Sequence, residues 1–401
     1  MDFRERLNLK YAAPTKKLTL LGASGSIGKT TLEVLRRFPQ IQLEEISVHT
    51  SIKELPKLIE EFQPKQITIT DESKFDEFTK NYHNVKIKFY RGYEGLLEMI
   101  NHSQGDTVLN ALTGSIGLEA TIEAIKNQKK LCIANKESLV VGGELIFQML
   151  KQYQAPLIPV DSEHNAAFQL LLSQNPKNIR KLILTASGGP FRDYTTEELK
   201  KVKKEDVLKH PTWNMGKKIT VDSASLINKG LEVIEAHYIF GLPYEKIDVK
   251  IHKDSFVHSM IQLNDGSYML ATSPPNMIFP IAHSLFFPEV LPEKLKEFQE
   301  PENWPCLKFY PVDKEKYPGF YLCIEAGTLG KSAPIVLNAS NEVAVDLFLN
   351  DQIHFTEIPL IIKDALENIP IVEIHDFNII LKINREVKEY VINRYKTLYT
   401  R

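Results

Sequence analysis

The feature that most constrains the fold is a glycine-rich turn between an apolar run and a helical segment near the start of the chain. The run KLTLL (residues 17–21) is followed by GASGSIG (22–28) and then by KTTLEVLRRF (29–38), which has helical spacing. A strand, a glycine turn and a helix in this order favour dinucleotide binding, because glycine lets the backbone approach a pyrophosphate and the helix N-terminus supplies free N–H groups. The spacing GxxGxxG differs from the usual GxGxxG, so a plain tight turn is the alternative.

Strand-like and helix-like segments continue to alternate as far as about residue 160. Strand patterns such as EEISVHT, KQITIT, DTVLNAL and KLCIAN are separated by helical ones such as LEATIEAIKNQ. The tetrapeptide GSIG occurs at 25–28 and again at 114–117, each time between a strand and a helix. This alternation predicts an α/β fold with a Rossmann-like, doubly wound parallel sheet.

The texture changes after residue 160. KLILTAS, KIDVKIHK and VHSMIQLNDGSYMLATS predict a second sheet, in which NDG forms a hairpin turn. A proline- and charge-rich segment follows, and the last ninety or so residues have mostly helical patterns. We therefore expect a dinucleotide-binding domain (1–160), a central α+β catalytic domain (161–286), a linker (287–311) and a C-terminal helical domain (312–401).

Composition excludes several classes of protein. A formal net charge of −2 gives no global field that would favour nucleic acid or a membrane surface. The three cysteines are widely spaced and form no CxxC, so neither a zinc ribbon nor a disulfide framework is indicated. The N-terminal residues lack a signal-peptide core, and no apolar run reaches ~18 residues. We expect a cytoplasmic protein whose metal site, if it has one, uses oxygen or histidine ligands.

The stretch PVDSEHNA (159–166) follows a strand and carries two carboxylates, Asp161 and Glu163, on either side of Ser162. One interpretation is a helix cap, with Glu163 favoured by the helix dipole. The other is a pair of oxygen ligands for Mg²⁺ or Mn²⁺. For these residues alone the cap is the commoner arrangement, and a third carboxylate elsewhere would favour the metal.

Further polar residues follow other predicted strands. Asn135, Lys136 and Glu137 come after KLCIA, where side chains point into the ligand crevice of a parallel sheet, although a solvated loop is an equal alternative. Ser187 begins a run with two glycines, which suits a phosphate but equally suits a plain turn. His210 lies in HPTWNMGKK, whose makeup is typical of a mobile loop that folds over a ligand.

VDSASLINKGLE (221–232) combines hydroxyl, amide, lysine and carboxylate side chains in twelve residues. We expect Ser223 at the N-terminus of a helix that carries Asn228 and Lys229, which together would clamp a phosphate. Glu232 lies one turn after Asn228 and is the candidate third carboxylate. An ordinary surface helix with a Lys229–Glu232 pair is the alternative.

Six motifs in order resemble one family: GASGSIGKTTLEVL, LCIANKESLVVGG, PVDSEHNAAFQLL, SGGPFRD, HPTWNMGKKITVDSASLINKGLEVIEAHYIFG and NASNEVAVDLFL. The family is 1-deoxy-D-xylulose 5-phosphate reductoisomerase, and the block from His210 to Gly241 is its most specific part. The resemblance implies NADPH and one divalent cation (Mg²⁺ or Mn²⁺, with Co²⁺ possible) as cofactors. It also implies a sugar phosphate as substrate and a homodimer.

The resemblance assigns roles residue by residue. The implied metal ligands are Asp161, Glu163 and Glu232. The implied catalytic residues are Lys136, Glu163 and His210. The implied substrate contacts are Ser162, Glu163, Ser187, His210, Ser223, Asn228 and Lys229. The implied NADPH contacts are Ser24, Gly25, Ser26, Ile27, Asn135, Glu137 and Gly216.

The implied reaction is a rearrangement of the carbon skeleton of 1-deoxy-D-xylulose 5-phosphate, by retro-aldol and aldol steps or by a ketol shift. Reduction by NADPH then gives 2-C-methyl-D-erythritol 4-phosphate. From the residues alone two other functions stay open: another NAD(P)-dependent oxidoreductase, which needs no third carboxylate, and a non-catalytic dinucleotide sensor. The second predicted strand ends in VHTS, which has neither an acid for a ribose hydroxyl nor an arginine for a 2′-phosphate.

Overall fold

The computed structural model describes residues 2–80, 82, 86–207, 216–291, 295 and 300–395. The chain divides into two compact units. Unit 1 contains residues 1–138, 146–165 and 276–298, and unit 2 contains residues 139–145, 166–275 and 299–401.

Unit 1 is built on a seven-stranded parallel sheet in the order β4-β3-β2-β1-β5-β6-β7. Its strands are β1 (Lys17–Leu21), β2 (Gln42–Val48), β3 (Gln66–Ile69), β4 (Lys88–Arg91), β5 (Thr107–Asn110), β6 (Lys130–Ile133) and β7 (Leu157–Pro159). The strands at the centre are buried almost throughout, which is why they read as continuous apolar runs. The chain reverses direction across the sheet between β1 and β5, where ligands bind in folds of this kind. The predicted Rossmann-like fold is confirmed.

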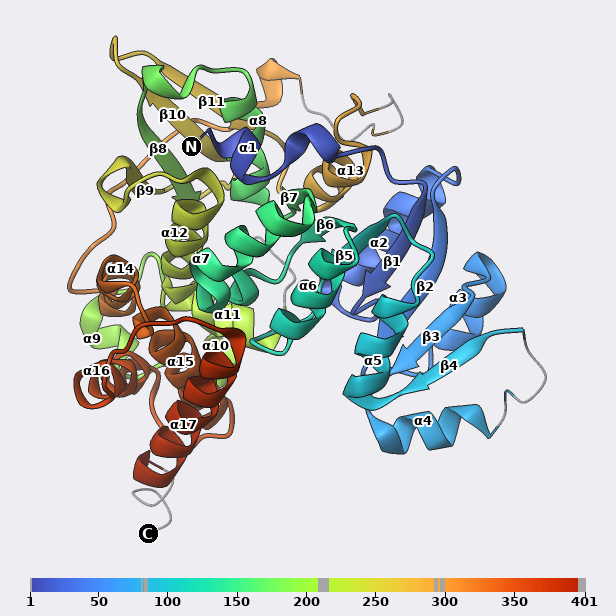
Figure 1. Ribbon diagram of the computed structural model, residues 1–401. Helices are drawn as coiled ribbons and strands as arrows, with labels where there is room; N and C mark the ends of the chain where they lie inside the picture. The colour runs from blue at the N-terminus through green and yellow to red at the C-terminus, as the bar shows by residue number, and fades with distance from the viewer. Residues whose placement is uncertain are drawn as a thin grey trace. The chain divides into compact units, whose positions relative to one another are not determined.

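Helices connect these strands by crossovers. They are α2 (Ser26–Arg37), α3 (Leu55–Phe62), α4 (Glu72–Thr79), α5 (Gly92–Asn101) and α6 (Gly117–Lys126). Because right-handed crossovers that run in opposite directions fall on opposite faces of a sheet, α2–α4 cover one face and α5 and α6 the other. Contacts between α5 and α6 agree with this arrangement. Figure 1 shows these helices around the blue-to-teal strands.

Four more helices contribute to unit 1. They are α1 (Phe3–Arg6), α7 (Lys136–Tyr153), α8 (Ser162–Leu172) and α13 (Ile278–Phe286). The middle of α7 and the end of α8 belong to unit 2 by packing, and α7 is interrupted at Gly143, which has φ 49° and ψ −138°. The sequence patterns did not predict α1, α5 or α13. In α13 the helical segment follows two prolines, and α5 contains two glycines, which weaken a helical signal.

Unit 2 contains a mixed four-stranded sheet in the order β11-β10-β8-β9. Its strands are β8 (Ile179–Ala186), β9 (Ile247–Ile251), β10 (Val257–Leu263) and β11 (Tyr268–Thr272). Strands β8 and β9 are parallel, whereas β10 pairs antiparallel with both β8 and β11. The predicted NDG hairpin joins β10 to β11, with Gly266 at φ 91°. The predicted second sheet is therefore confirmed.

Eight α-helices lie wholly within the described part of unit 2. They are α9 (Thr196–Leu199), α10 (Lys204–Val207), α11 (Lys217–Ala224), α12 (Ile227–Phe240), α14 (Pro318–Leu329), α15 (Ala333–Leu349), α16 (Ile358–Asn368) and α17 (Phe377–Tyr395). Helix α15 packs against α14, α16 and α17, and α12 packs against α14. The C-terminal part is helical, as predicted.

The cysteines differ in their surroundings. Cys132 of β6 lies in unit 1 and Cys323 of α14 in unit 2, and both thiols are free and fully buried. Burial raises the pKa of each thiol above its usual range. Cys306 is free and exposed. Within the described part of the chain, no helix has the length and hydropathy needed to span a bilayer.

Candidate active site

The predicted site residues of unit 1 follow three strands of one group of four neighbours. Because β1, β5, β6 and β7 are parallel and adjacent, their carboxyl ends meet at one edge of the sheet. The turns after β1, β6 and β7 carry the predicted cofactor and metal residues, and the turn after β5 contains the second GSIG. Unit 1 thus gathers its candidate site residues at the edge where α/β sheets bind ligands.

The first glycine turn (residues 22–28) leads from β1 into α2. Gly22 has φ +85°, and a Cβ there would lie 2.7 Å from the carbonyl oxygen of Ala111. A Cβ on Gly28 would lie 2.3 Å from the carbonyl oxygen of Gly22. Packing therefore requires both outer glycines. Gly25, by contrast, is the N-cap of α2, is exposed and makes no side-chain cap, so the helix N-terminus stays open to an anion.

The start of α7 follows β6. Asn135 is the N-cap of this helix, and Asn135, Lys136 and Glu137 are all buried. Lys136 forms a hydrogen-bonded ion pair through Nζ with Oδ2 of Asp161, which follows β7. The ion pair joins the ends of two adjacent strands, so the prediction that Lys136 faces the crevice is consistent with its position.

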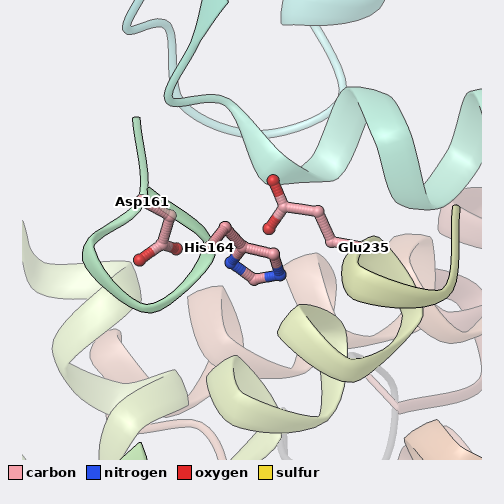
Figure 2. A group of neighbouring side chains, drawn as sticks. All are labelled: Asp161, His164 and Glu235. Carbon is pink, nitrogen blue, oxygen red and sulfur yellow. The ribbon is translucent and has the colours of Figure 1, made fainter. Parts of the chain in front are cut away.

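The start of α8 carries the DSE motif. The N–H of Asn165 donates to the carbonyl oxygen of Asp161 at 2.8 Å, which gives Asp161 the backbone position of a helix cap. Ser162 Oγ donates to Oε2 of Glu163 at 2.6 Å. Figure 2 labels Asp161 and His164 from this turn and Glu235 from α12. The cap and the metal interpretations are thus compatible at Asp161, because its backbone caps the helix while its carboxylate stays at the strand end.

The turn after β8 contains the predicted Ser187. Gly188 and Gly189 follow with φ +82° and +67°, and the N–H of Gly189 donates to Ser187 Oγ at 3.2 Å. A Cβ on Gly189 would lie 2.7 Å from the carbonyl oxygen of Ser223. The glycine turn therefore packs directly against the end of α11 and brings Ser187 near Ser223.

The predicted position of Ser223 at a helix N-terminus is wrong. Ser223 lies in the last turn of α11, and a separate helix, α12, begins at Ile227. Leu226 between them is in the left-handed region with φ 56°, and Ser225 Oγ donates back to the carbonyl oxygens of Val221 and Asp222. Such back-bonding competes with helix propagation. The break at Ser225 and Leu226 contains neither glycine nor proline, so the sequence pattern did not indicate it.

The first turns of α12 carry the remaining residues. Asn228 Nδ2 donates to Oε1 of Glu232, and Lys229 Nζ donates to Oε2 of the same carboxylate. Lys229 and Glu232 are 3% and 2% exposed. A Cβ on Gly230 would lie 2.4 Å from Cβ of Cys323, so this glycine lets α12 lie directly against α14. The spacing predicted from the sequence, with amide, lysine and carboxylate on one side of a helix, is present.

Gly216 and His210 are the remaining predicted site residues. Gly216 is the exposed N-cap of α11, with open space around it. His210 and its neighbours Trp213 and Met215 lie outside the described residues. Sequence reasoning did not single out Asn110 or Gly117, which shape the turn after β5, although the repeated GSIG was the available signal.

The fold and these side chains define a two-unit α/β protein of the dinucleotide-binding class, with acidic and basic residues at its strand and helix ends. Models of 1-deoxy-D-xylulose 5-phosphate reductoisomerase match residues 18–143, and models of its C-terminal domains match 157–240 and 272–390. The chain belongs to the 1-deoxy-D-xylulose 5-phosphate reductoisomerase family.

Relatives agree over most of the chain. The reductoisomerase of Leptospira borgpetersenii is 47% identical over 89% of this chain and 92% of its own. That of Listeria welshimeri is 42% identical over 94% of this chain and 99% of its own. A reductoisomerase solved with NADPH, fosmidomycin and magnesium matches with a TM-score of 0.89 and 33% identity, covering 96% of this chain and 99% of that one. The Zymomonas mobilis enzyme with NADPH matches with a TM-score of 0.87 and 33% identity, covering 95% and 99%.

Proposed function

We propose that this protein is an NADPH-dependent oxidoreductase that converts 1-deoxy-D-xylulose 5-phosphate into 2-C-methyl-D-erythritol 4-phosphate in the non-mevalonate isoprenoid pathway, with a divalent cation as cofactor. The observation that carries the proposal is the full-length match to reductoisomerases, one of which was solved with NADPH and magnesium. The two lysine–carboxylate pairs add chemistry that an ordinary dinucleotide-binding protein does not need.

The first glycine turn is the proposed site of the NADPH pyrophosphate. Ser24, Gly25, Ser26 and Ile27 surround the open N-terminus of α2, whose N–H groups and dipole favour an anion. Asn135 and Glu137 at the start of α7, and Gly216 at the start of α11, complete the proposed cofactor residues. NADPH, when bound, supplies the hydride that reduces the rearranged aldehyde, and the protein positions it.

The proposed metal ligands are Asp161, Glu163 and Glu232. Their donor atoms are carboxylate oxygens, which suit Mg²⁺ and Mn²⁺ and, less selectively, Co²⁺. Two of these carboxylates already hold a cationic partner, Lys136 or Lys229, so both environments accept positive charge. The residues present therefore fit a divalent cation. Such an ion, when bound, polarises the substrate carbonyl as a Lewis acid.

The substrate phosphate is proposed to lie against the end of α11 and the start of α12. Ser187 and Ser223 offer hydroxyl groups there, Asn228 an amide and Lys229 an ammonium, with His210 assigned to the same group by resemblance. Charge-assisted hydrogen bonds from lysine to phosphate are among the stronger polar contacts in proteins. Ser162, Glu163 and Lys136 are proposed to contact the reacting end of the sugar, with Lys136, Glu163 and His210 as catalytic residues.

Four further points belong to the proposal. They are homodimer assembly, location in the cytoplasm, use of Mn²⁺ and the division into functional domains at 1–160, 161–286, 287–311 and 312–401. The family resemblance supports the homodimer and Mn²⁺, and the three widely spaced cysteines without a CxxC support the cytoplasm. The change of strand pattern after β7, together with the helical patterns that follow residue 312, supports the division.

An NADPH-oxidation assay tests the proposal. The absorbance of NADPH at ~340 nm should fall only when 1-deoxy-D-xylulose 5-phosphate and Mg²⁺ or Mn²⁺ are both present, and chelation of the metal should stop the reaction reversibly. Parallel reactions with NADH measure the cofactor preference, and reactions with 1-deoxy-D-xylulose, which lacks the phosphate, test the substrate class. Absence of NADPH consumption with the substrate and Mn²⁺ would refute the assignment.

A further inference from the structure

Asn135 has no hydrogen-bonding capacity left for a cofactor. Its Oδ1 accepts from both the N–H and the hydroxyl of Ser138. Its Nδ2 lies 2.9 Å from the carbonyl oxygens of both Leu112 and Gly114, and 3.2 Å from Oε2 of Glu137. A side-chain amide has two N–H donors and two acceptor lone pairs, so all of them are used, and the side chain is 1% exposed.

A second buried amide holds the same segment from the other side. Asn110, at the end of β5, donates through Nδ2 to the carbonyl oxygen of Gly117 at 3.0 Å and to Thr121 Oγ1 at 2.9 Å. Its Oδ1 accepts from the N–H of Leu112 at 3.2 Å. Residues 112–117, which we name the second glycine turn, are therefore fixed between amides from two adjacent strand ends.

The fit between this turn and Asn135 is tight. A Cβ on Gly117 would lie 2.2 Å from Oδ1 of Asn135, so the last glycine of the second GSIG is required by the amide. The carbonyl oxygen of Ile116 accepts from the hydroxyl of Tyr93 at 2.6 Å, while the Ile116 side chain is 51% exposed. The turn thus has a fixed backbone and presents an apolar side chain at the ligand-binding edge.

The sheet order indicates which half of the cofactor meets this turn. In a doubly wound sheet the turn after β1 binds the pyrophosphate, and the end of β2 lies beside the adenosine ribose. The second glycine turn follows β5, on the opposite side of β1 from β2. The nicotinamide half therefore extends over β5 and β6.

We propose that Asn135 is a positioning residue: it fixes the second glycine turn as the wall against which the nicotinamide half of NADPH packs, and it does not bind the cofactor through its own side chain. This inference rests on the proposed use of NADPH and refines the role of Asn135 in it. It concerns binding alone, so it is tested in the absence of substrate and metal.

The test compares two ligands. Dissociation constants are measured by calorimetry for NADPH and for adenosine 2′,5′-bisphosphate, which lacks the nicotinamide half. Asn135→Ala is expected to weaken NADPH binding roughly tenfold, the scale of a lost set of hydrogen bonds, and to leave adenosine 2′,5′-bisphosphate binding unchanged. Unchanged NADPH binding, or an equal loss for both ligands, would overturn the proposal.

Asn8→Ala is the matched control. Asn8 is also a buried amide of unit 1, and it also donates to two carbonyl oxygens, those of Leu150 and Ala155. Its loss should lower stability to a similar extent while leaving both dissociation constants unchanged. An Asn8→Ala variant with the same selective loss of NADPH binding would show that general loosening of unit 1 causes the effect.

Gly117→Ala approaches the same contact from the turn and keeps the test decisive if Asn135→Ala fails to fold. Its methyl group displaces the Asn135 amide, so NADPH binding should again weaken roughly tenfold without loss of adenosine 2′,5′-bisphosphate binding. In the variant that carries both Asn135→Ala and Gly117→Ala, the methyl group occupies the space left by the amide. This double variant should bind NADPH no more weakly than whichever single variant binds it more weakly. Additive losses would mean that Asn135 acts on the cofactor independently of the turn, against the proposal.

The two proposals fail separately. The variants could lose NADPH binding selectively, with adenosine 2′,5′-bisphosphate binding unchanged, while the wild type does not oxidise NADPH with 1-deoxy-D-xylulose 5-phosphate. This result would refute only the proposed reaction. Normal turnover by the wild type, with no selective loss of NADPH binding in the variants, would refute only the role of Asn135.

Discussion

Each unit contains a lysine–carboxylate pair among its candidate site residues, but the two pairs are built differently. In unit 1, Lys136 and Asp161 come from the ends of two strands and are 25 residues apart, and the carboxylate is partly exposed. In unit 2, Lys229 and Glu232 lie on one turn of α12, and both side chains are almost fully buried. One pair thus depends on the order of strands in a sheet and the other on the geometry of a single helix.

The difference in exposure affects how readily a metal ion can replace the lysine at each carboxylate. A partly exposed carboxylate can exchange its lysine for a metal ion with little desolvation, whereas a fully buried pair cannot lose either partner without leaving an uncompensated charge. Glu232 should therefore be the less replaceable of the two carboxylates, and Asp161 the more tolerant. The following predictions test this ranking.

Glu232→Gln should have the largest effect. The variant keeps the size of the side chain but removes its charge, so turnover should fall by roughly 10²–10³-fold or more, while NADPH binding survives. Steady-state rates and calorimetric titration with NADPH measure the two properties. The control is Glu342→Gln, which removes a carboxylate paired with Lys388 at 2.6 Å on α15 and α17 and should turn over normally. Turnover of Glu232→Gln at the wild-type rate would exclude Glu232 as a metal ligand.

Asp161→Asn should have a smaller effect that excess metal corrects. We expect the Mn²⁺ concentration for half-maximal rate to rise roughly 100-fold, at the upper end of losses seen for groups that support a metal site, with most of the maximal rate recovered at saturation. Asp71→Asn is the control, because Asp71 is likewise an acid that follows a strand and caps a helix. An unchanged metal requirement would place the cation elsewhere, and a loss as irreversible as that of Glu232→Gln would erase the proposed difference between the units.

Lys229→Ala should chiefly raise the KM for the sugar phosphate. A charge-assisted contact contributes about 1.5–3 kcal/mol, which corresponds to an increase in KM of roughly tenfold to 100-fold. The variant also leaves the Glu232 carboxylate without its lysine, so added Mn²⁺ should raise its melting temperature more than that of the wild type. Lys388→Ala, which removes the partner of Glu342, controls for loss of a lysine from a lysine–carboxylate pair between helices. If KM does not change, the phosphate lies away from α12.

The smallest effect concerns the stability of unit 1. Burial, with a further contribution from Lys130, lowers the pKa of His283 on α13 to about 4. As the pH falls from ~6.5 towards 4, the unfolded chain takes up a proton that the folded protein does not, so stability is lost in this window. Between pH 7.5 and 5.5 the free energy of unfolding should fall by about 1 kcal/mol through this group.

Urea denaturation at the two pH values, followed by hydrogen exchange in unit 1, measures this loss. His283→Gln should show a smaller pH dependence, and His102→Gln, which alters an exposed histidine of the same unit, should keep that of the wild type. Equal pH dependence in wild type and His283→Gln would remove His283 as the cause.

The two pairs also show what a sequence can predict. Asn228, Lys229 and Glu232 could be placed together because helical spacing fixes neighbours on one helix. The pairing of Lys136 with Asp161 could not be predicted, because it needs β6 and β7 to be adjacent, and strand order is a property of the whole sheet. The position of Ser223 was mispredicted because the break at Leu226 uses neither glycine nor proline.

The parallel sheet itself was predicted correctly, since alternating strands and helices leave few other arrangements. The role of Asn135 was less accessible. Its position after a strand indicated a ligand-binding side chain, but only the hydrogen-bond partners show that its amide is used within the protein. A motif indicates where a residue lies, and its free donors and acceptors decide what it can bind.

The two buried cysteines allow the opening of each unit to be measured separately, by labelling of their thiols. A thiol-specific reagent should modify Cys306 at once, because it is exposed, whereas Cys132 and Cys323 are protected by burial. Cys132 belongs to unit 1 and Cys323 to unit 2. The order in which these two thiols become labelled, read by mass spectrometry of the peptides, would therefore show which half of the molecule opens first, without any engineered probe.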